Sequence, residues 1–141
     1  MTTIAGDLVR AFGDVDTMQQ MYADDIVWQL PAALGPAAGP HRGKDAVLGF
    51  NTAAWSQFYL ATGVSVDIHD ELEQGDVSVA RFTYRAIVAA DGAPYENEYM
   101  LLARARDGKI IEVYEFLDSL KTMHYAGLRA FAPPIPGVTD L

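Results

Sequence analysis

The spacing of apolar residues gives the first part of the chain a helical pattern that ends in a short strand. Apolar positions recur at helical spacing over residues 4–22, with a break at Gly13-Asp14, and Ala23-Asp24-Asp25 ends this pair of helices. In residues 26–30, Ile26, Trp28 and Leu30 then alternate with Val27 and Gln29. This alternation predicts a short strand, and Pro31 ends it because proline interrupts strand pairing.

A long helix and a run of strands follow. Residues 44–61 carry a continuous apolar stripe, which predicts a helix that stops at Gly63. After this glycine the pattern has a period of two and predicts four strands. The first strand begins at residue 64, and the other three cover residues 77–88, 95–106 and 109–117. Asp118-Ser119 can cap a last helix that extends to about residue 130. This order predicts an α+β fold in which a curved antiparallel sheet wraps around the long helix.

Two segments rich in proline do not fit either period. Residues 31–43 contain three prolines and three glycines, which predicts an irregular loop. The loop is rather apolar, so it forms either a lid over a pocket or a packed crossover. Residues 131–141 form an irregular tail, which we expect to lie on its own domain or on a partner subunit.

Composition limits the classes of function. The 141 residues suit a single domain, 1–141, with a formal net charge of −9. Nucleic acids and anionic membrane surfaces require a basic face, so we expect neither as a partner. The chain has no cysteine, hence no thiol nucleophile or thiolate metal site. It shows neither a signal peptide nor an apolar run of about 20 residues, and we expect it in the cytoplasm.

The most informative polar residues lie on the predicted core face of the last two strands. Parity places Asn97 and Tyr99 on the inner side of one strand and Glu115 on the inner side of the next. A carboxyl group in an apolar cavity has a raised pKa, which suits a general acid or base near neutral pH. Alternatively, Glu115 forms an ion pair with Arg85 or Arg81. A Glu115 locked to an arginine without an adjoining void would argue against an enzyme.

Other candidates have an ordinary structural explanation beside the functional one. Asp118 either caps the last helix or takes part in catalysis. His41, in the proline-rich loop, is either a surface residue or a proton shuttle. Apolar pocket walls are expected from Trp28, Phe50 and Trp55.

Several well-known motifs are missing from the sequence. No pair of histidines has the spacing of metal ligands, and no glycine-rich phosphate loop or GxSxG motif occurs. We therefore expect neither a metal ion nor a cofactor. Tyr114 and Phe116 lie on the opposite, outer face of the last strand together with Ile110, and this apolar face needs cover, for example from another subunit.

The order and spacing of four segments resemble the SnoaL-like and ketosteroid-isomerase-like branch of the nuclear transport factor 2-like superfamily. The segments are Gly13-Asp14, residues 22–28 (YADDIVW), residues 42–47 (RGKDAV), and residues 107–110 (DGKI) leading to 115–118 (EFLD). The resemblance implies a cystatin-like cone that binds a hydrophobic small molecule. It also implies a homodimer formed through the outer face of the sheet. Polyketide cyclases of the SnoaL type use an acidic general acid/base, which Glu115 or Asp118 could supply.

The sequence departs from two better-understood groups of this superfamily. Gly6 and Leu30 stand where the steroid isomerases have a catalytic tyrosine and a carboxylate base. Arg85 and Glu115 match two residues of the limonene-epoxide-hydrolase-like triad, but Ile87 replaces its middle aspartate. The resulting hypothesis is a cofactor-independent isomerase, cyclase or epoxide hydrolase with Glu115, Arg85 and Asp118 as catalytic residues. Substrate-binding residues would be Trp28, His41, Phe50, Trp55, Asn97 and Tyr99. The alternative is a non-catalytic ligand-binding or dimeric assembly domain of the same fold.

Overall fold

The computed structural model describes residues 2–125. Its helical elements are α1 (Ile4–Arg10), α2 (Val15–Gln19), the short 3₁₀ segment η1 (Ala32–Ala38), α3 (Lys44–Ala53), the π-helical turn η2 (Ala54–Phe58) and α4 (Ser119–Tyr125). Its strands are β1 (Tyr22–Gln29), β2 (His41–Arg42), β3 (Ser65–Gln74), β4 (Val77–Ile87), β5 (Pro94–Arg106) and β6 (Lys109–Leu117). The tail at 131–141 and the predicted end of the last helix lie outside the described residues.

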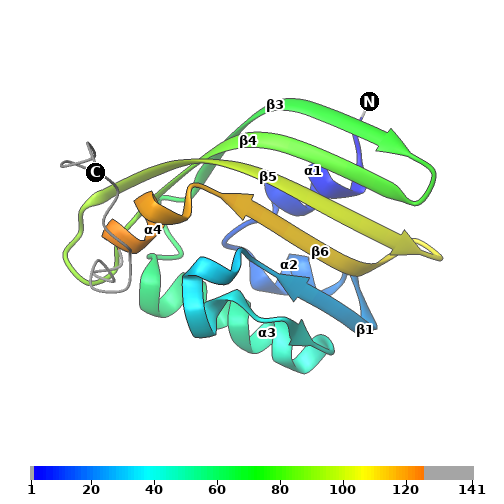
Figure 1. Cartoon of the computed structure of the whole chain (residues 1–141), viewed down its shortest axis with the longest axis horizontal. Helices are drawn as coiled ribbons and strands as arrows, with labels where there is room; N and C mark the ends of the chain where they lie inside the picture. The colour runs from blue at the N-terminus through cyan, green and yellow to red at the C-terminus, as the bar shows by residue number, and fades with distance from the viewer. Residues whose placement is uncertain (1, 126–141) are drawn as a thin grey trace.

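One curved sheet, ordered β2-β1-β6-β5-β4-β3, organises residues 2–125 (Figure 1). The long strands β3 to β6 form an antiparallel meander, as predicted, and helices α1, α2 and α3 gather on one face. The predicted α+β cone is thereby confirmed. The sheet contains one parallel pair, β1 with β6, which places Trp28 opposite Val113. No strand period reveals such a pairing, because its two segments are far apart in sequence.

Capping side chains set the beginnings of the first two helices. The Thr3 hydroxyl accepts a hydrogen bond from the Gly6 N–H (3.0 Å), and an Asp14 carboxylate oxygen accepts one from the Thr17 N–H (3.1 Å). These contacts satisfy backbone donors that a helix leaves unpaired in its first turn. The predicted break at Gly13-Asp14 is therefore present, with Asp14 as the N-cap of α2.

Some predicted boundaries were wrong. Ala23-Asp24-Asp25 does not end a helix but lies within β1, because the chain turns into the strand at Tyr22. The long helix stops at Phe58 instead of residue 61, as Tyr59 pairs with Val88 in an isolated bridge.

The inner and outer faces of the meander differ as parity requires, except at two bulges, one on β3 between Ile68 and Asp70 and one between β5 and β6. On β5, Asn97, Tyr99 and Leu101 are buried and their neighbours are exposed. On β6, Ile110 was expected on the outer face but is fully buried. The pairing of β5 with β6 shifts between Arg104 and Ala105, and this shift moves Ile110 to the inner side.

An ion pair and two hydrogen bonds to Glu71 hold α1 against the sheet. Glu71 Oε1 accepts hydrogen bonds from the Thr3 N–H (3.0 Å) and the Thr3 hydroxyl (2.9 Å), and the carboxylate pairs with Arg10. These donors, the Arg10 bond foremost, lower the pKa of Glu71 to about 2. Gly6 makes this approach possible, because a Cβ there would lie 1.8 Å from Glu71 Oε1.

The first prediction concerns this contact. Gly6→Ala should lower the free energy of unfolding by about 1–2 kcal/mol, since the Glu71 carboxylate must move away from its donors. Urea unfolding would measure it. The matched control is Gly49→Ala in α3, where no atom lies within 4 Å of the new Cβ and alanine should stabilise by about 0.5–1 kcal/mol.

The pH dependence tests the cause of that loss. The pKa of Glu71 is lower in the folded protein than its ordinary value of 4.5, so its contribution is complete above that value and disappears as the pH falls towards 2. The difference between wild type and Gly6→Ala should shrink over the same range. Equal losses at Gly6 and Gly49 would contradict the explanation.

Candidate functional site

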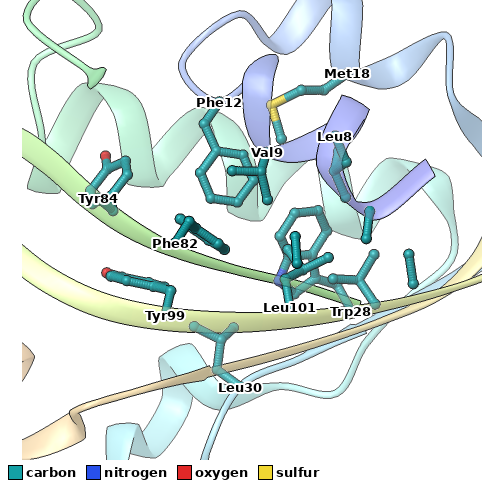
Figure 2. Close-up of a cluster of buried hydrophobic side chains, with 14 of the residues drawn as sticks. Leu8, Val9, Phe12, Met18, Trp28, Leu30, Phe82, Tyr84, Tyr99 and Leu101 are labelled. Carbon is teal, nitrogen blue, oxygen red and sulfur yellow. The ribbon is translucent and has the colours of Figure 1, made fainter. Parts of the chain in front are cut away.

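A cavity of about 240 Å³ lies between the inner face of the sheet and the helices. Its walls come from the end of α1, from η1, α3 and η2, from β4, β5 and β6, and from α4. Figure 2 shows the sheet side of this region, where Phe12 lies over Phe82 with Tyr84 and Tyr99 beside them. Most of the wall is aromatic or aliphatic, so the cavity suits an apolar ligand. Its volume is slightly below the roughly 300–1,000 Å³ of drug-sized ligand sites, which favours a small one.

Glu115 is the one carboxylate residue that lines the cavity among the described residues. It lies on β6 and only 7% of it is exposed. Oε2 accepts a hydrogen bond of 3.0 Å from Trp28 Nε1, and no described cation forms an ion pair with the carboxylate. Burial raises the pKa of Glu115 to about 7, whereas the Trp28 bond, which favours the charged form, opposes the shift. The group can therefore take up and release a proton near neutral pH.

The parallel pairing of β1 with β6 sets the Trp28–Glu115 contact. Trp28 is the register partner of Val113, and Glu115 follows two residues later on the same face of β6. Trp28 is 1% exposed and lies behind the cavity wall, where its ring packs near Phe50 with centroids 6.0 Å apart. Its role is to hold the carboxyl group, while the expected apolar walls at Phe50 and Trp55 do line the cavity.

A cluster of phenol side chains forms another polar part of the cavity wall. Tyr59, Tyr84 and Tyr99 all line the cavity, and the Tyr84 oxygen accepts a hydrogen bond of 2.8 Å from Trp55 Nε1. The sequence hypothesis contained Tyr99 but missed Tyr59 and Tyr84. The buried even-numbered positions of β4 would have identified Tyr84, had the inner face of that strand been assigned.

Asn97 supports the wall without forming part of it. Its amide nitrogen lies 3.0 Å from the Tyr95 hydroxyl, the Asp118 carbonyl oxygen and the Thr122 hydroxyl. The Tyr95 hydroxyl is in turn 2.8 Å from that of Tyr99. Asn97 thus joins β5 to α4, and it does not line the cavity, contrary to the expected role in substrate binding.

Asp118 occupies the position of a helix cap. Its Oδ1 accepts a hydrogen bond of 3.2 Å from the Lys121 N–H, and its carbonyl oxygen accepts one of 3.1 Å from the Thr122 N–H. Asp118 does not line the cavity. The structure therefore favours the capping interpretation over the catalytic one.

Arg85 lies on the wrong side of the sheet for the expected role. Its side chain is 44% exposed and forms ion pairs with Asp67 (2.7 Å) and Glu96 (2.6 Å) on the outer face. Odd positions of β4 point outward, because the cavity side carries Phe82, Tyr84 and their even-numbered neighbours. The expected contact between Arg85 and Glu115 was wrong. Ile87, two residues later on β4, lies on the same side of the strand as Arg85.

The proline-rich loop covers the cavity. Leu34 and Ala37 of η1 line it, and His41 Nε2 lies 2.9 Å from the Ala37 carbonyl oxygen. The His41 ring is stacked on Phe50 at 4.3 Å and does not line the cavity. His41 thus supports the loop, and its Nε2 must carry the proton because a carbonyl oxygen can only accept.

The two positions that depart from the steroid isomerases have a physical explanation. A side chain at Gly6 would displace the Glu71 carboxylate, which occupies that space. Leu30 lines the cavity as an apolar group. Among residues 2–125, no three His, Asp or Glu side chains are placed to hold a metal ion, and no helix is long and apolar enough to cross a membrane.

The profile of the SnoaL-like domain matches residues 8–113, which is most of the chain. The chain belongs to the SnoaL-like domain family. This is the family that the sequence segments indicated. No curated protein matches the chain.

Solved structures share this fold. A protein with a ketosteroid isomerase-like fold from Catenulispora acidiphila, solved in complex with trimethylamine, superposes with a TM-score of 0.75 at 16% identity, covering 95% of this chain and 99% of that one. IdmH from Streptomyces antibioticus, a candidate polyketide cyclase, gives 0.66 at 25% identity, covering 85% and 93%. A candidate isomerase from Bacillus subtilis gives 0.73 at 20% identity, covering 89% and 94%.

The second prediction concerns the protonation of Glu115. Carbon-detected NMR of the Glu115 carboxyl should show a titration midpoint near 7, and Trp28→Phe should raise it further by removing the bond that favours the carboxylate. Trp55→Phe is the matched control, because its indole donates to Tyr84 instead. A midpoint near 4.5 in the wild type would contradict the burial argument.

Proposed function

We propose that this protein is a cofactor-independent enzyme in which Glu115 transfers a proton to or from a hydrophobic small molecule. The observation that carries the proposal is a buried carboxyl group with a pKa near 7 that faces an apolar cavity. A general base is most effective when its pKa lies close to the working pH. The two conditions that would have argued against an enzyme, a Glu115 locked to an arginine and a missing void, do not hold in the described residues.

The arrangement favours proton transfer at carbon over epoxide opening. Epoxide opening of the limonene-epoxide-hydrolase type would need an arginine beside the carboxylate, whereas Arg85 points to the outer face. A lone base in an apolar site suits abstraction of a proton next to a carbonyl group, the step that isomerisation and aldol-type cyclisation share. The neighbours named as a candidate polyketide cyclase and a candidate isomerase are consistent with this class.

The third prediction tests the proposed base without knowledge of the natural product. Bicyclic ketones such as 2-tetralone, incubated with the protein in D₂O, should exchange their α-protons, with a rate that rises through a pH of about 7 as Glu115 ionises. NMR would follow the exchange. Glu115→Gln should lower the enzyme-dependent rate by about 10²–10⁴-fold, because the amide cannot accept the proton.

Controls separate catalysis from binding. Glu115→Asp keeps a base and should retain part of the activity, and circular dichroism should show that both variants are folded. Exchange at the wild-type rate in Glu115→Gln would remove Glu115 as the base. Ligand binding without exchange in the wild type would favour the non-catalytic binding domain.

The proposal includes a homodimer formed through the outer face of the sheet. Leu72, Met100 and Phe116 are 68%, 46% and 50% exposed there, and the rings of Tyr114 and Phe116 stack at 4.4 Å. The register places Phe116 beside Met100, and Tyr114, one row away, beside Leu102. Contiguous apolar residues on a sheet face are typical of a protein interface.

The fourth prediction follows from that face. Phe116→Lys should shift the protein from dimer to monomer in sedimentation velocity, because a charge would be buried in the interface. Leu60→Lys is the control, since Leu60 is 40% exposed but lies outside the sheet. A wild-type protein that sediments as a monomer would exclude the dimer.

A further inference from the structure

Tyr84 differs from Tyr99, another phenol of the cavity, in the hydrogen-bond partners of its hydroxyl group. Trp55 Nε1 can only donate a hydrogen bond, so in the 2.8 Å contact the Tyr84 oxygen is the acceptor. The Tyr84 proton therefore needs a different partner. The described residues form no hydrogen bond that accepts it, although Tyr84 is only 2% exposed and lines the cavity.

The neighbouring hydroxyl groups are already engaged. Tyr99 and Thr122 each lie 2.8 Å from the Tyr95 hydroxyl, and Asn97 donates to that hydroxyl at 3.0 Å. This network has acceptors for its protons within the protein, such as the Asp118 carbonyl oxygen. Tyr99 therefore has a hydrogen-bond partner within this network. The Tyr84 hydroxyl, in contrast, can donate its proton only towards the cavity.

Tyr84 and Glu115 are placed to contact the same ligand. Both lie on the inner face, on strands separated by β5, and their register partners on β5 are four residues apart, so roughly 16 Å of sheet lies between their backbones. The charge of Glu115 is nevertheless felt at Tyr84, where it adds to burial in raising the pKa of the phenol. No hydrogen bond joins the two groups, so a ligand between them would contact the base on one side and the phenol on the other.

We infer that Tyr84 is a specificity-determining residue that donates a hydrogen bond to an oxygen atom of the ligand. The substrate class is then a small, mostly apolar ring compound with a carbonyl oxygen. The inference rests on the proposed function only in taking this cavity as the binding site. A buried donor discriminates strongly because a ligand without an acceptor leaves it unpaired.

The test compares two probes of the same shape, 2-tetralone and tetralin, of which only the ketone has an oxygen. Isothermal titration should show that the wild type binds the ketone at least about tenfold more tightly. Tyr84→Phe should abolish that preference and leave tetralin binding unchanged. The matched control is Tyr114→Phe, which removes a phenol hydroxyl from the outer face and should keep the preference.

Two further measurements protect the test against a folding defect. The infrared carbonyl stretch of 2-tetralone bound to the wild type should lie below its value in an apolar solvent, which requires no variant. Circular dichroism should show that Tyr84→Phe is folded like the wild type.

Each result decides the inference separately from the proposed function. A preference that persists in Tyr84→Phe, an unshifted stretch, or a wild type that does not bind the ketone would overturn the role of Tyr84. Exchange at the wild-type rate in Glu115→Gln, with a ketone preference that depends on Tyr84, would instead overturn the proposed base and leave the role of Tyr84 intact. Failure of one proposal can therefore be told from failure of the other.

Discussion

The burial of one carboxyl group with one indole donor is the constraint on which the site depends. An ionised carboxylate is costly in an apolar cavity, and the Trp28 bond compensates for only part of that cost. The balance leaves Glu115 with a pKa of about 7. A stronger partner, such as an arginine, would have fixed the negative charge, and without a partner the group would have stayed protonated. Its proton-transfer capacity thus follows from having a weak partner.

The sheet separates two electrostatic environments by side-chain parity. Its inner face carries Glu115 among aromatic groups, whereas its outer face carries arginine–carboxylate pairs such as Arg85 with Asp67. Exposed pairs of this kind contribute roughly 0–1 kcal/mol each and do not disturb the interior. The acidic and basic residues of the chain are therefore abundant outside the cavity, while a single carboxylate residue lines it in the described part.

The parts that shape the cavity come from distant positions in the chain. Phe12, at the end of α1, is held in place because Glu71 anchors that helix to the sheet, and Asn97 ties α4 to β5. The loop that contains Leu34 closes another side. Helices and strands thus surround the cavity, and Tyr84 and Glu115 line it from β4 and β6.

The sequence by itself determined the four strands of the meander, their hairpins and the position of Glu115 on the inner face, because local periodicity reports which side of a strand is buried. It did not assign the inner face of β4, where both faces carry residues that a sheet accepts, so Arg85 was misplaced and Tyr84 was missed. The parallel pairing that brings Trp28 to Glu115, and the bulge that buries Ile110, joined segments that no local pattern connects. Only the tertiary structure decided these contacts, since they arise from packing between distant parts of the chain.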